Sequence, residues 1–376
     1  MKTGVYVHIP FCRSKCFYCD FLSFACPKKN SAQDFDLYLK KLLSEINNCV
    51  ELKKSHIETI FFGGGTPSIL PHEFIYKILD AIYKNSLGTT KKNLEITIES
   101  NPESLNQEKI CAYKSYGINR ISIGLQAIQD KFLKKIGRAH NFKTFEQVYA
   151  IAKKFFNNIN IDLIFALPDQ NLSAWEENLR YIKTIQPAHF SAYSLIIEKD
   201  TKFYFADQKN KLNLPDENLE RQMYHTIKKI LWDYKQYEIS NWAREKKFEC
   251  RHNKIYWQLK NYLGFGLGAH SFFNNTRWHN TNNFKKYLTQ NNFREEIIKS
   301  TRQSLIEEFI FLGLRLNQGV NKNKFKKKFG CEINNIYHNQ ISLLTKQKLL
   351  AENKNFIFLR DYGRDLANYV MSNFIL

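Results

Sequence analysis

The chain has 376 residues, and its 56 Lys and Arg against 36 Asp and Glu give a formal net charge of +20. A hydrophobic content of 43% excludes a disordered chain, and the length favours about two or three domains. No apolar run approaches the roughly 20 residues of a membrane span. The N-terminus does not read as a signal peptide, because His8 and Pro10 interrupt its short apolar stretch. We therefore expect a cytoplasmic protein.

The basic charge is spread along the chain. Lysine and asparagine are frequent throughout, and we expect the densest basic stretch, Lys322–Lys328, to form one solvated helix face. Specific nucleic-acid binding would need basic and aromatic residues gathered on one element. We therefore predict no specific nucleic-acid partner, and contact with an anionic membrane face remains an alternative use of the charge.

Short apolar strands alternate with amphipathic helices from residue 4 to about 195, which predicts an α/β protein. The predicted strands are Val5–Ile9, Thr59–Phe62, Leu94–Glu99, Arg120–Gly124, Asn160–Phe165 and His189–Ser194. The predicted helices between them are Asp36–Val50, Phe74–Tyr83, Gln107–Tyr116, Thr144–Phe156 and Ala174–Ile185. Repeated βα units favour a parallel sheet with right-handed crossovers, closed or partly closed into a barrel.

The pattern changes after residue 200. A long helix is predicted at Glu217–Trp232, followed by an irregular, aromatic and glycine-rich stretch from Tyr237 to Phe273. The C-terminal part has predicted helices and one strand, a pattern similar to a small winged-helix domain: Gln303–Leu314, Asn323–Phe329, Asn335–Gln347 and the strand Asn355–Leu359. The predicted division is a barrel at 1–235, an irregular extension at 236–300 and a winged-helix-like domain at 301–376.

Three cysteines follow the first predicted strand with the spacing C-x3-C-x2-C: Cys12, Cys16 and Cys19. Three thiolates on one loop can hold an iron–sulfur cluster and leave one iron open to another ligand. The alternatives are a zinc knuckle with a distant fourth ligand, or three unrelated buried thiols. The remaining cysteines lack such spacing, and we expect most of them to be small core residues.

Polar or glycine residues stand at the carboxyl ends of several predicted strands, where barrels place their active sites. The run Gly63-Gly64-Gly65-Thr66-Pro67 follows the second strand, and Glu99 ends the third. Gln126 follows the fourth strand, and Asp162 lies in the fifth. Glycines let the backbone approach a ligand closely, although an ordinary tight turn would also explain them. A surface salt bridge would likewise explain Glu99. The recurrence at one edge predicts a single site.

These motifs resemble the radical S-adenosylmethionine (SAM) superfamily, which implies a partial (β/α)6 barrel. The resemblance implies that Cys12, Cys16 and Cys19 bind a [4Fe-4S] cluster whose fourth iron is capped by SAM. It further implies a SAM pocket made by the GGGTP loop, by polar side chains of later strands and by residues near the cluster: Gly64, Gly65, Thr66, Glu99, Gln126, Arg138, Asp162, Tyr6 and Tyr18.

The run Tyr-Val-His-Ile-Pro-Phe-Cys and the runs around Gly64, Glu99, Gln126 and Asp162 resemble the coproporphyrinogen-oxidase-like branch of that superfamily. One group in this branch is the oxygen-independent coproporphyrinogen III dehydrogenase, which carries a fourth cysteine where this chain has Phe21, and a long segment before the cysteines. The other group is the HemW-type haem chaperones. The sequence resembles the second group, because Phe21 replaces the cysteine, only eleven residues precede Cys12, and His252-Asn253-Lys254-Ile255-Tyr256-Trp257 has the H-N-x-x-Y-W pattern.

The resemblance implies a chaperone that binds haem and transfers it to acceptor proteins, and it is compatible with a homodimer. The basic surface could favour contact with anionic membranes that house such acceptors. His252 is the candidate iron ligand, and aromatic neighbours can face the macrocycle. His8, His270 and His279 are weaker candidates, and His8 is expected to support the cluster loop. Two alternatives remain: His252 and Trp257 only pack an irregular segment, or the protein is the dehydrogenase. A winged-helix nucleic-acid binder is a third reading, which the dispersed charge disfavours.

Overall fold

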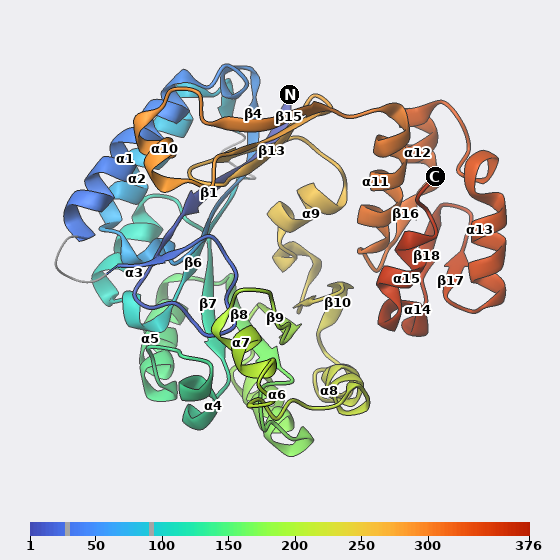
Figure 1. Ribbon diagram of the computed structural model, residues 1–376, viewed down its shortest axis with the longest axis horizontal. Coiled ribbons are helices and arrows are strands. Elements are labelled where there is room, and N and C mark those ends of the chain that lie inside the picture. Colours follow the sequence, from blue (N-terminus) through green and yellow to red (C-terminus); the bar gives the residue numbers. More distant parts are fainter. Residues whose placement is uncertain (27–30, 90–93) are drawn as a thin grey trace.

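The computed structural model of the protein describes residues 1–26, 31–89 and 94–376. Within these residues a 13-stranded sheet runs in the order β10-β11-β9-β8-β7-β6-β4-β1-β12-β13-β14-β15, with β5 (Gly88–Thr89) paired to β4 (Figure 1). Six parallel strands correspond to the predicted strands and confirm the βα pattern: β1 (Lys2–Ile9), β4 (His56–Gly64), β6 (Glu95–Ser100), β7 (Arg120–Gln126), β8 (Ile159–Phe165) and β9 (His189–Ser194). β5 and β12 also pair in parallel, with β4 and β1 respectively.

Helices cover the outer face of this curved sheet (Figure 1). They match the predicted helices closely and are α1 (Ser31–Asn48), α2 (His72–Asn85), α3 (Gln107–Ser115), α5 (Phe142–Phe155), α6 (Leu172–Ile185) and α8 (Glu217–Ile230). Asn106, Asn141 and Asn171 each accept a hydrogen bond from the first turn of the helix that follows, which explains where α3, α5 and α6 begin. Two short helices, α4 (Asp130–Lys135) and α7 (Lys202–Asp207), were not predicted.

Residues 236–300 contain regular strands and helices, so the prediction that this segment is irregular was wrong. This segment contains β10 (Lys235–Glu238, beginning one residue earlier), β11 (Asn241–Ala243), α9 (Arg251–Trp257), β12 (Tyr262–Phe265), β13 (His270–Phe273), β14 (Thr276–Asn280), α10 (Phe284–Thr289) and β15 (Arg294–Lys299). β11 pairs with β9 and β12 pairs with β1, so the segment extends the sheet at both ends. The strands are too short to show a clear period of two in the sequence.

Residues 301–376 form a helical unit around a second hydrophobic core, to which Leu259 and Phe272 of the preceding segment also contribute. Its elements are α11 (Arg302–Leu314), β16 (Val320–Asn321), α12 (Lys322–Phe329), α13 (Asn334–Lys346), β17 (Leu350–Glu352), β18 (Phe356–Leu359), α14 (Asp361–Asp365) and α15 (Ala367–Ser372). The antiparallel order β16-β18-β17 beside α11–α13 is the arrangement of a winged helix. Whether 1–235, 236–300 and 301–376 behave as separate units remains a prediction.

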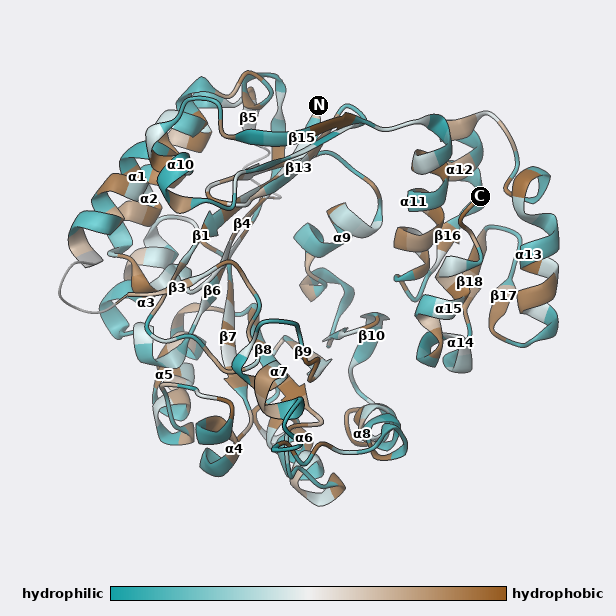
Figure 2. Ribbon diagram, viewed as in Figure 1, coloured by the Kyte–Doolittle hydropathy of each residue, from teal (hydrophilic) through white to brown (hydrophobic). Residues whose placement is uncertain are grey.

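Helix α9 lies between the barrel and the C-terminal unit and contacts both β4 and α11 (Figure 1). The hydropathy colouring shows brown segments along the barrel strands and mixed colours on the outer helices, as expected for a sheet buried under amphipathic helices (Figure 2). Among the described residues, no helix combines the length and apolar character needed to cross a membrane.

Candidate functional site

The three cysteines lie on a loop that starts where β1 ends. A two-residue strand β2 (Phe11–Cys12) pairs in parallel with β3 (Phe24–Ala25) and closes this loop at its base. The backbone N–H of Cys26 donates to the carbonyl of Cys12 at 2.9 Å. Cys12, Cys16 and Cys19 are all partly exposed free thiols, so the loop presents three sulfur atoms that are not used in disulfides.

His8 contacts the backbone of the cysteine loop and so supports it, as predicted. Its Nε2 lies 2.8 Å from the carbonyl oxygen of Leu22, and its Nδ1 lies 3.0 Å from the hydroxyl of Tyr6. Burial lowers the pKa of His8 to about 4, against a smaller opposing effect of the Leu22 contact, so the ring is neutral near pH 7. Within the loop, Lys15 Nζ donates to Ser23 Oγ at 3.0 Å.

The glycine run at the end of β4 packs directly against this loop. The Gly65 N–H donates to Ile9 O at 2.8 Å, and the Thr66 hydroxyl donates to Cys12 Sγ at 3.4 Å. A Cβ on Gly65 would lie 2.6 Å from Phe11 O and 3.0 Å from Cys12 Sγ. Gly64 has φ +109°, and a Cβ there would lie 2.6 Å from the His8 ring. The glycines are therefore needed for close approach to the cysteine loop.

Thr66, Gln126 and Arg138 gather beside the same loop. Arg138 Nη1 donates to Cys16 Sγ at 3.6 Å, and its Nη2 donates to Gly124 O at 3.1 Å and to Asn101 Oδ1. Asn101 Nδ2 in turn donates to Thr66 Oγ1 at 2.9 Å. Hydrogen bonds thus run from Cys16 through Arg138, Asn101 and Thr66 to Cys12.

Gln126 ends β7 in the left-handed region, with φ 69°. A Cβ on Gly124 would lie 2.8 Å from Gln126 Nε2 and 2.7 Å from Arg138 Nη2, so the two side chains lie over that glycine. Non-glycine residues in this region carry strain that is common at functional sites. The geometry brings Gln126 and Arg138 together, as the sequence predicts.

Glu99 and Asp162 form an acidic pair near the glycine run. Glu99 accepts a backbone hydrogen bond from Gly64, while burial first and then the charge of Asp162 raise the pKa of Glu99 to about 8. Asp162 accepts hydrogen bonds from Ser122 Oγ at 2.7 Å and Asn160 Nδ2 at 2.8 Å. These carboxyl groups could accept hydrogen bonds from a ribose or balance a cationic ligand.

Tyr18 belongs to the cysteine loop, and Tyr6 lies in β1, which leads into it. Burial, with a smaller effect of Glu99, raises the pKa of Tyr6. Burial also raises the pKa of Tyr18 against the opposing charge of Arg138, so both phenols stay neutral. Tyr18 packs with Phe17 beside α4, whereas Tyr6 lies 6.5 Å, ring to ring, from His252.

His252 lies inside the protein on α9, with 1% of the residue exposed. Its Nδ1 lies 2.7 Å from Thr59 Oγ1 and its Nε2 lies 2.8 Å from the Tyr256 hydroxyl. Its ring stacks on Phe61 at 5.0 Å. Burial, with a smaller effect of Arg120, lowers the pKa of His252 to about 3. Both ring nitrogens are therefore engaged, which corresponds to the packing alternative drawn from the sequence.

Sequence reasoning missed the residues that hold α9 in place. Glu95 Oε1 accepts from the N–H of His252 and Oε2 from that of Arg251, both at 3.0 Å. Arg315 of the segment after α11 lies 4.3 Å from the Trp257 ring. The predicted strand around Leu94 shows Glu95 only as one more strand residue, so no local signal could have identified its role.

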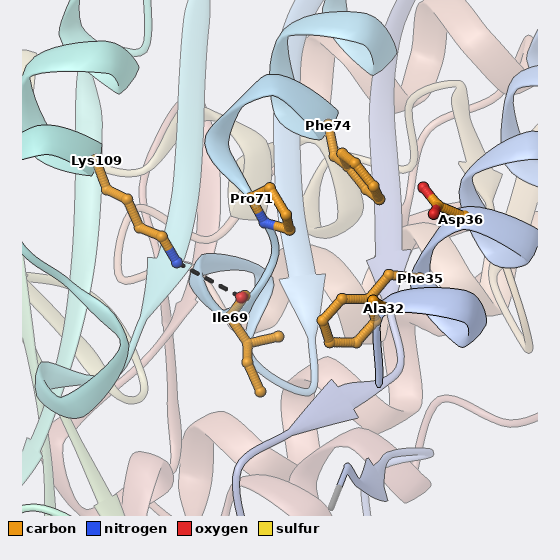
Figure 3. A pocket seen from close by; sticks show the side chains of 7 residues that line it. All are labelled: Ala32, Phe35, Asp36, Ile69, Pro71, Phe74 and Lys109. Atoms are coloured by element: carbon orange, nitrogen blue, oxygen red, sulfur yellow. Dashed lines mark hydrogen bonds between the residues drawn. The ribbon is translucent and has the colours of Figure 1, made fainter. Parts of the chain in front are cut away.

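A hollow of about 530 Å³ lies on the outer side of the glycine loop, bordered by Phe35, Ile69 and Phe74 (Figure 3). Lys109 reaches across it and donates to Ser68 O at 2.5 Å and Ile69 O at 3.5 Å, which anchors the turn Pro67–Ile69. A neighbouring hollow, lined in part by Arg13, Cys26 and Glu103, also contains Lys109. The second hollow borders the cysteine loop through Arg13 and Cys26, and neither hollow is lined by the three predicted ligands.

The donor set fits an iron–sulfur cluster. Among the residues that the structure describes, no three His, Cys, Asp or Glu side chains converge to hold a single metal ion. A cubane cluster binds each cysteine through a different iron, so its thiolates need not converge on one point. Cys12, Cys16 and Cys19 are the residues that would hold such a cluster.

Family comparisons agree with this geometry. The radical SAM superfamily matches residues 6–182, and the HemN C-terminal domain matches residues 301–366. Coproporphyrinogen III oxidase (HemN) from Escherichia coli superposes with a TM-score of 0.85 at 21% identity, covering 100% of this chain and 90% of that one, which shows the fold. The fold and the three-cysteine loop are those of a radical SAM protein.

The similarity to curated relatives identifies one family within the radical SAM superfamily. Proteins named "Heme chaperone HemW" from Bacillus subtilis and Haemophilus influenzae are 36% and 32% identical to this chain, covering 100% and 99% of it and 99% and 97% of the relatives. "Radical S-adenosyl methionine domain-containing protein 1, mitochondrial" of Mus musculus is 30% identical over 85% of this chain and 74% of that protein. The chain belongs to the HemW family.

Proposed function

We propose that this protein binds haem and delivers it to acceptor proteins, and that it carries a [4Fe-4S] cluster on Cys12, Cys16 and Cys19 with SAM beside it. The observation that supports this proposal most is the full-length similarity to relatives named as haem chaperones. The cluster supplies redox chemistry and a binding point for SAM. Thr66, Gln126 and Arg138, which lie next to the loop, would orient SAM.

Phe21 supports the chaperone over the coproporphyrinogen III dehydrogenase. It stands where the dehydrogenase has its fourth cysteine, and it is 64% exposed at the tip of the cysteine loop. An exposed aromatic ring can contact a macrocycle or a partner but cannot supply a thiolate. The fold similarity to HemN by itself does not favour the dehydrogenase, because one fold can support different activities.

His252 could ligate haem iron through Nε2 only after a hydrogen bond of this nitrogen is broken. Its Nε2 is bonded to Tyr256, so an iron atom could reach this nitrogen only after that hydrogen bond opens. We propose that haem and the Tyr256 hydroxyl compete for His252. Removing the hydroxyl should then favour haem, whereas it should have no such effect if His252 only packs α9 against β4.

An anaerobic haem titration followed by absorbance tests this proposal, with wild type, His252→Ala and Tyr256→Phe compared. We expect a sharp Soret band in the wild type, an altered band in His252→Ala, and tighter binding in Tyr256→Phe. His225→Ala is the matched control, because His225 is a half-exposed surface residue that contacts Asp365. A wild-type protein that does not bind haem would refute the chaperone proposal.

If His252→Ala leaves the spectrum unchanged, only the ligand assignment fails, and His8, His270, His279 and Cys250 are tested next. His270 is the exposed member of this group, and its ring stacks on His279 at 5.0 Å. A parallel assay with coproporphyrinogen III, SAM and a low-potential reductant should show no repeated turnover. Repeated turnover would reassign the protein to the dehydrogenase.

The remaining parts of the proposal concern partners and location. A cytoplasmic protein with a net charge of +20 could meet haem acceptors at an anionic membrane face. Cosedimentation with anionic and neutral vesicles tests that contact, and sedimentation velocity with and without SAM tests the homodimer. We expect binding to anionic vesicles to weaken as salt is added, because the attraction is electrostatic.

A further inference from the structure

The turn between β12 and β13, residues 266–268, lies against the cysteine loop. Its sequence is Gly-Leu-Gly, and both glycines have positive φ, +100° for Gly266 and +65° for Gly268. A Cβ on Gly266 would lie 2.6 Å from His8 O, and a Cβ on Gly268 would overlap Leu22 Cδ2 of the loop. The carbonyl oxygen of Leu22 also contacts His8 Nε2 at 2.8 Å. The turn therefore touches both the loop and the residue that supports it.

Helix α1 holds this turn through two buried polar side chains, Tyr38 and Glu45. They are seven residues apart in the helix, so they lie on the same face of α1 about two turns from each other. The Tyr38 hydroxyl accepts a hydrogen bond from Leu267 N at 3.0 Å and donates one to His8 O at 2.7 Å. This single hydroxyl group therefore joins the turn to the end of β1, the strand that leads into the cysteine loop.

Glu45 fixes the first residue of the turn. Its Oε2 accepts hydrogen bonds from Gly266 N at 3.0 Å and from the Tyr287 hydroxyl at 2.7 Å. Its Oε1 accepts from Asn280 Nδ2 at 2.7 Å, and the same amide nitrogen donates to Gly266 O at 2.7 Å. The N–H and the carbonyl of Gly266 are thus both held by buried side chains.

The placement of these polar groups calls for an explanation. Apolar side chains could bury this face of α1 without the desolvation cost that a buried carboxylate and hydroxyl carry. Hydrogen bonds differ from apolar contacts because they depend on distance and direction, so they fix the atoms that they join. Here those atoms are the backbone of the turn and His8 O, and His8 in turn contacts the carbonyl of Leu22 in the loop.

We infer that Tyr38, Glu45 and the turn 266–268 are positioning elements, which hold the cysteine loop in the conformation that binds the cluster. Tyr38 and Glu45 act through the turn and through His8. Holding a loop in its binding conformation lowers the ordering cost of binding and slows loss of the ligand. The inference rests on the cluster part of the proposed function and does not depend on haem or SAM.

Hydrogen–deuterium exchange of the full chain without its cluster tests the positioning directly. Tyr38→Phe removes the hydroxyl and keeps the ring, so the backbone amides of residues 11–26 should exchange about fivefold faster, the effect of one net hydrogen bond. Tyr234→Phe is the matched control, because the Tyr234 hydroxyl also donates to a buried carbonyl, Pro187 O, at 2.7 Å. It should leave the exchange of residues 11–26 unchanged, and urea midpoints show whether the two variants are equally destabilised.

The second measurement is the rate at which the reconstituted protein loses iron to a chelator under anaerobic conditions. Tyr38→Phe should lose iron about fivefold faster than the wild type, and Tyr234→Phe should stay within about twofold of it. Gly268→Ala should also speed the loss, whereas Gly330→Ala should not, because both have positive φ but open space surrounds the Gly330 Cβ. Glu45→Gln should change the rate in the same direction as Tyr38→Phe.

The outcomes separate positioning from general stability and from the cluster assignment. Equal effects of Tyr38→Phe and Tyr234→Phe on exchange and on iron loss would overturn the inference, because the loop would then respond only to overall stability. Wild-type behaviour of both Tyr38→Phe and Gly268→Ala would also overturn it. If the wild-type protein loads no cluster, the cluster assignment fails, and exchange alone decides whether Tyr38 positions the loop. If Tyr38→Phe does not fold, Glu45→Gln and the comparison of Gly268→Ala with Gly330→Ala decide the outcome.

Discussion

Thr59 Oγ1 on β4 and His252 Nδ1 on α9 lie 2.7 Å apart, although 193 residues separate them in the chain. This contact joins the barrel wall to the helix that carries the His-Asn-x-x-Tyr-Trp pattern. On the opposite side of α9, Trp257 meets Arg315 of the C-terminal unit. The pattern therefore lies where the two parts of the protein touch: a hydrogen bond joins it to β4, and a cation–π contact joins it to the C-terminal unit.

Thr59→Val should destabilise the protein by about 1–3 kcal/mol, because the buried His252 nitrogen loses its partner while the shape of the side chain is kept. Urea unfolding monitored by circular dichroism measures the change. Thr144→Val is the control, since that hydroxyl contacts Asn141 in an exposed position. A Thr59→Val protein as stable as the wild type would show that the contact adds nothing to stability.

Gly65→Ala should prevent normal cluster assembly, because the new Cβ would lie 2.6 Å from Phe11 O and close to Cys12 Sγ. We expect low iron and sulfide content after anaerobic reconstitution. Gly330→Ala serves as the control: it is also a strained substitution, at φ 75°, but open space surrounds that Cβ. It should cost about 1 kcal/mol of stability and leave the cluster content unchanged.

Replacing Cys12, Cys16 and Cys19 by Ala should abolish the broad visible absorbance of the reconstituted cluster. The Cys26→Ala and Cys250→Ala proteins should keep this absorbance. Cys26→Ala is the more stringent control, because Cys26 lies near Cys12. Burial raises the pKa of Cys250 to about 12, so this thiol is a poor ligand at neutral pH. Persistent iron and sulfide in the triple variant would disprove the ligand assignment.

Asp162→Ala should weaken SAM binding by roughly tenfold to a hundredfold if Asp162 contacts SAM, the effect of losing one charged hydrogen bond. The measurement is calorimetry on protein with an intact cluster. Asp130→Ala is the control, because Asp130 accepts from Phe142 N at an exposed position. Unchanged affinity would limit Asp162 to its hydrogen bonds with Ser122 and Asn160.

Glu45 should make stability depend on pH. It accepts hydrogen bonds from Gly266 N, Asn280 Nδ2 and the Tyr287 hydroxyl, and burial raises its pKa to about 7. The folded state therefore binds a proton that the unfolded state has released, and stability falls as pH rises from about 4.5 to about 7.

Comparison with Glu45→Gln isolates this effect from other titrating groups. The stability of the wild type relative to the variant should fall by about 2–3 kcal/mol between pH 5 and pH 8, because only the wild type can lose a proton at this position. Urea midpoints at the two pH values measure the difference. A difference that does not change with pH would show that Glu45 keeps one charge state throughout.

Much of the parallel sheet could be predicted, because its buried strands are continuous apolar runs in the sequence. The segments between them have apolar residues at the spacing of an α-helix. β9 begins and ends at the predicted residues, His189 and Ser194, and α8 begins at the predicted Glu217. The segment after Tyr237 could not be predicted in this way. Its strands contain four to six residues, or three in β11, and α9 contains seven, lengths at which neither period is visible.

The sequence by itself determined the chemistry of the cysteine loop, because ligand type and spacing along one short loop are local properties. It also determined which polar residues end which strands, and hence that Thr66, Glu99 and Gln126 would share one edge of the sheet, whereas Arg138 was expected there only from the resemblance to the radical SAM superfamily. The tertiary structure decided how these groups contact one another. Only the packing of distant segments joins Arg138 to Cys16 and to Asn101. Only burial against Thr59 and Tyr256 occupies both nitrogens of His252. Neither set of contacts leaves a pattern in neighbouring residues.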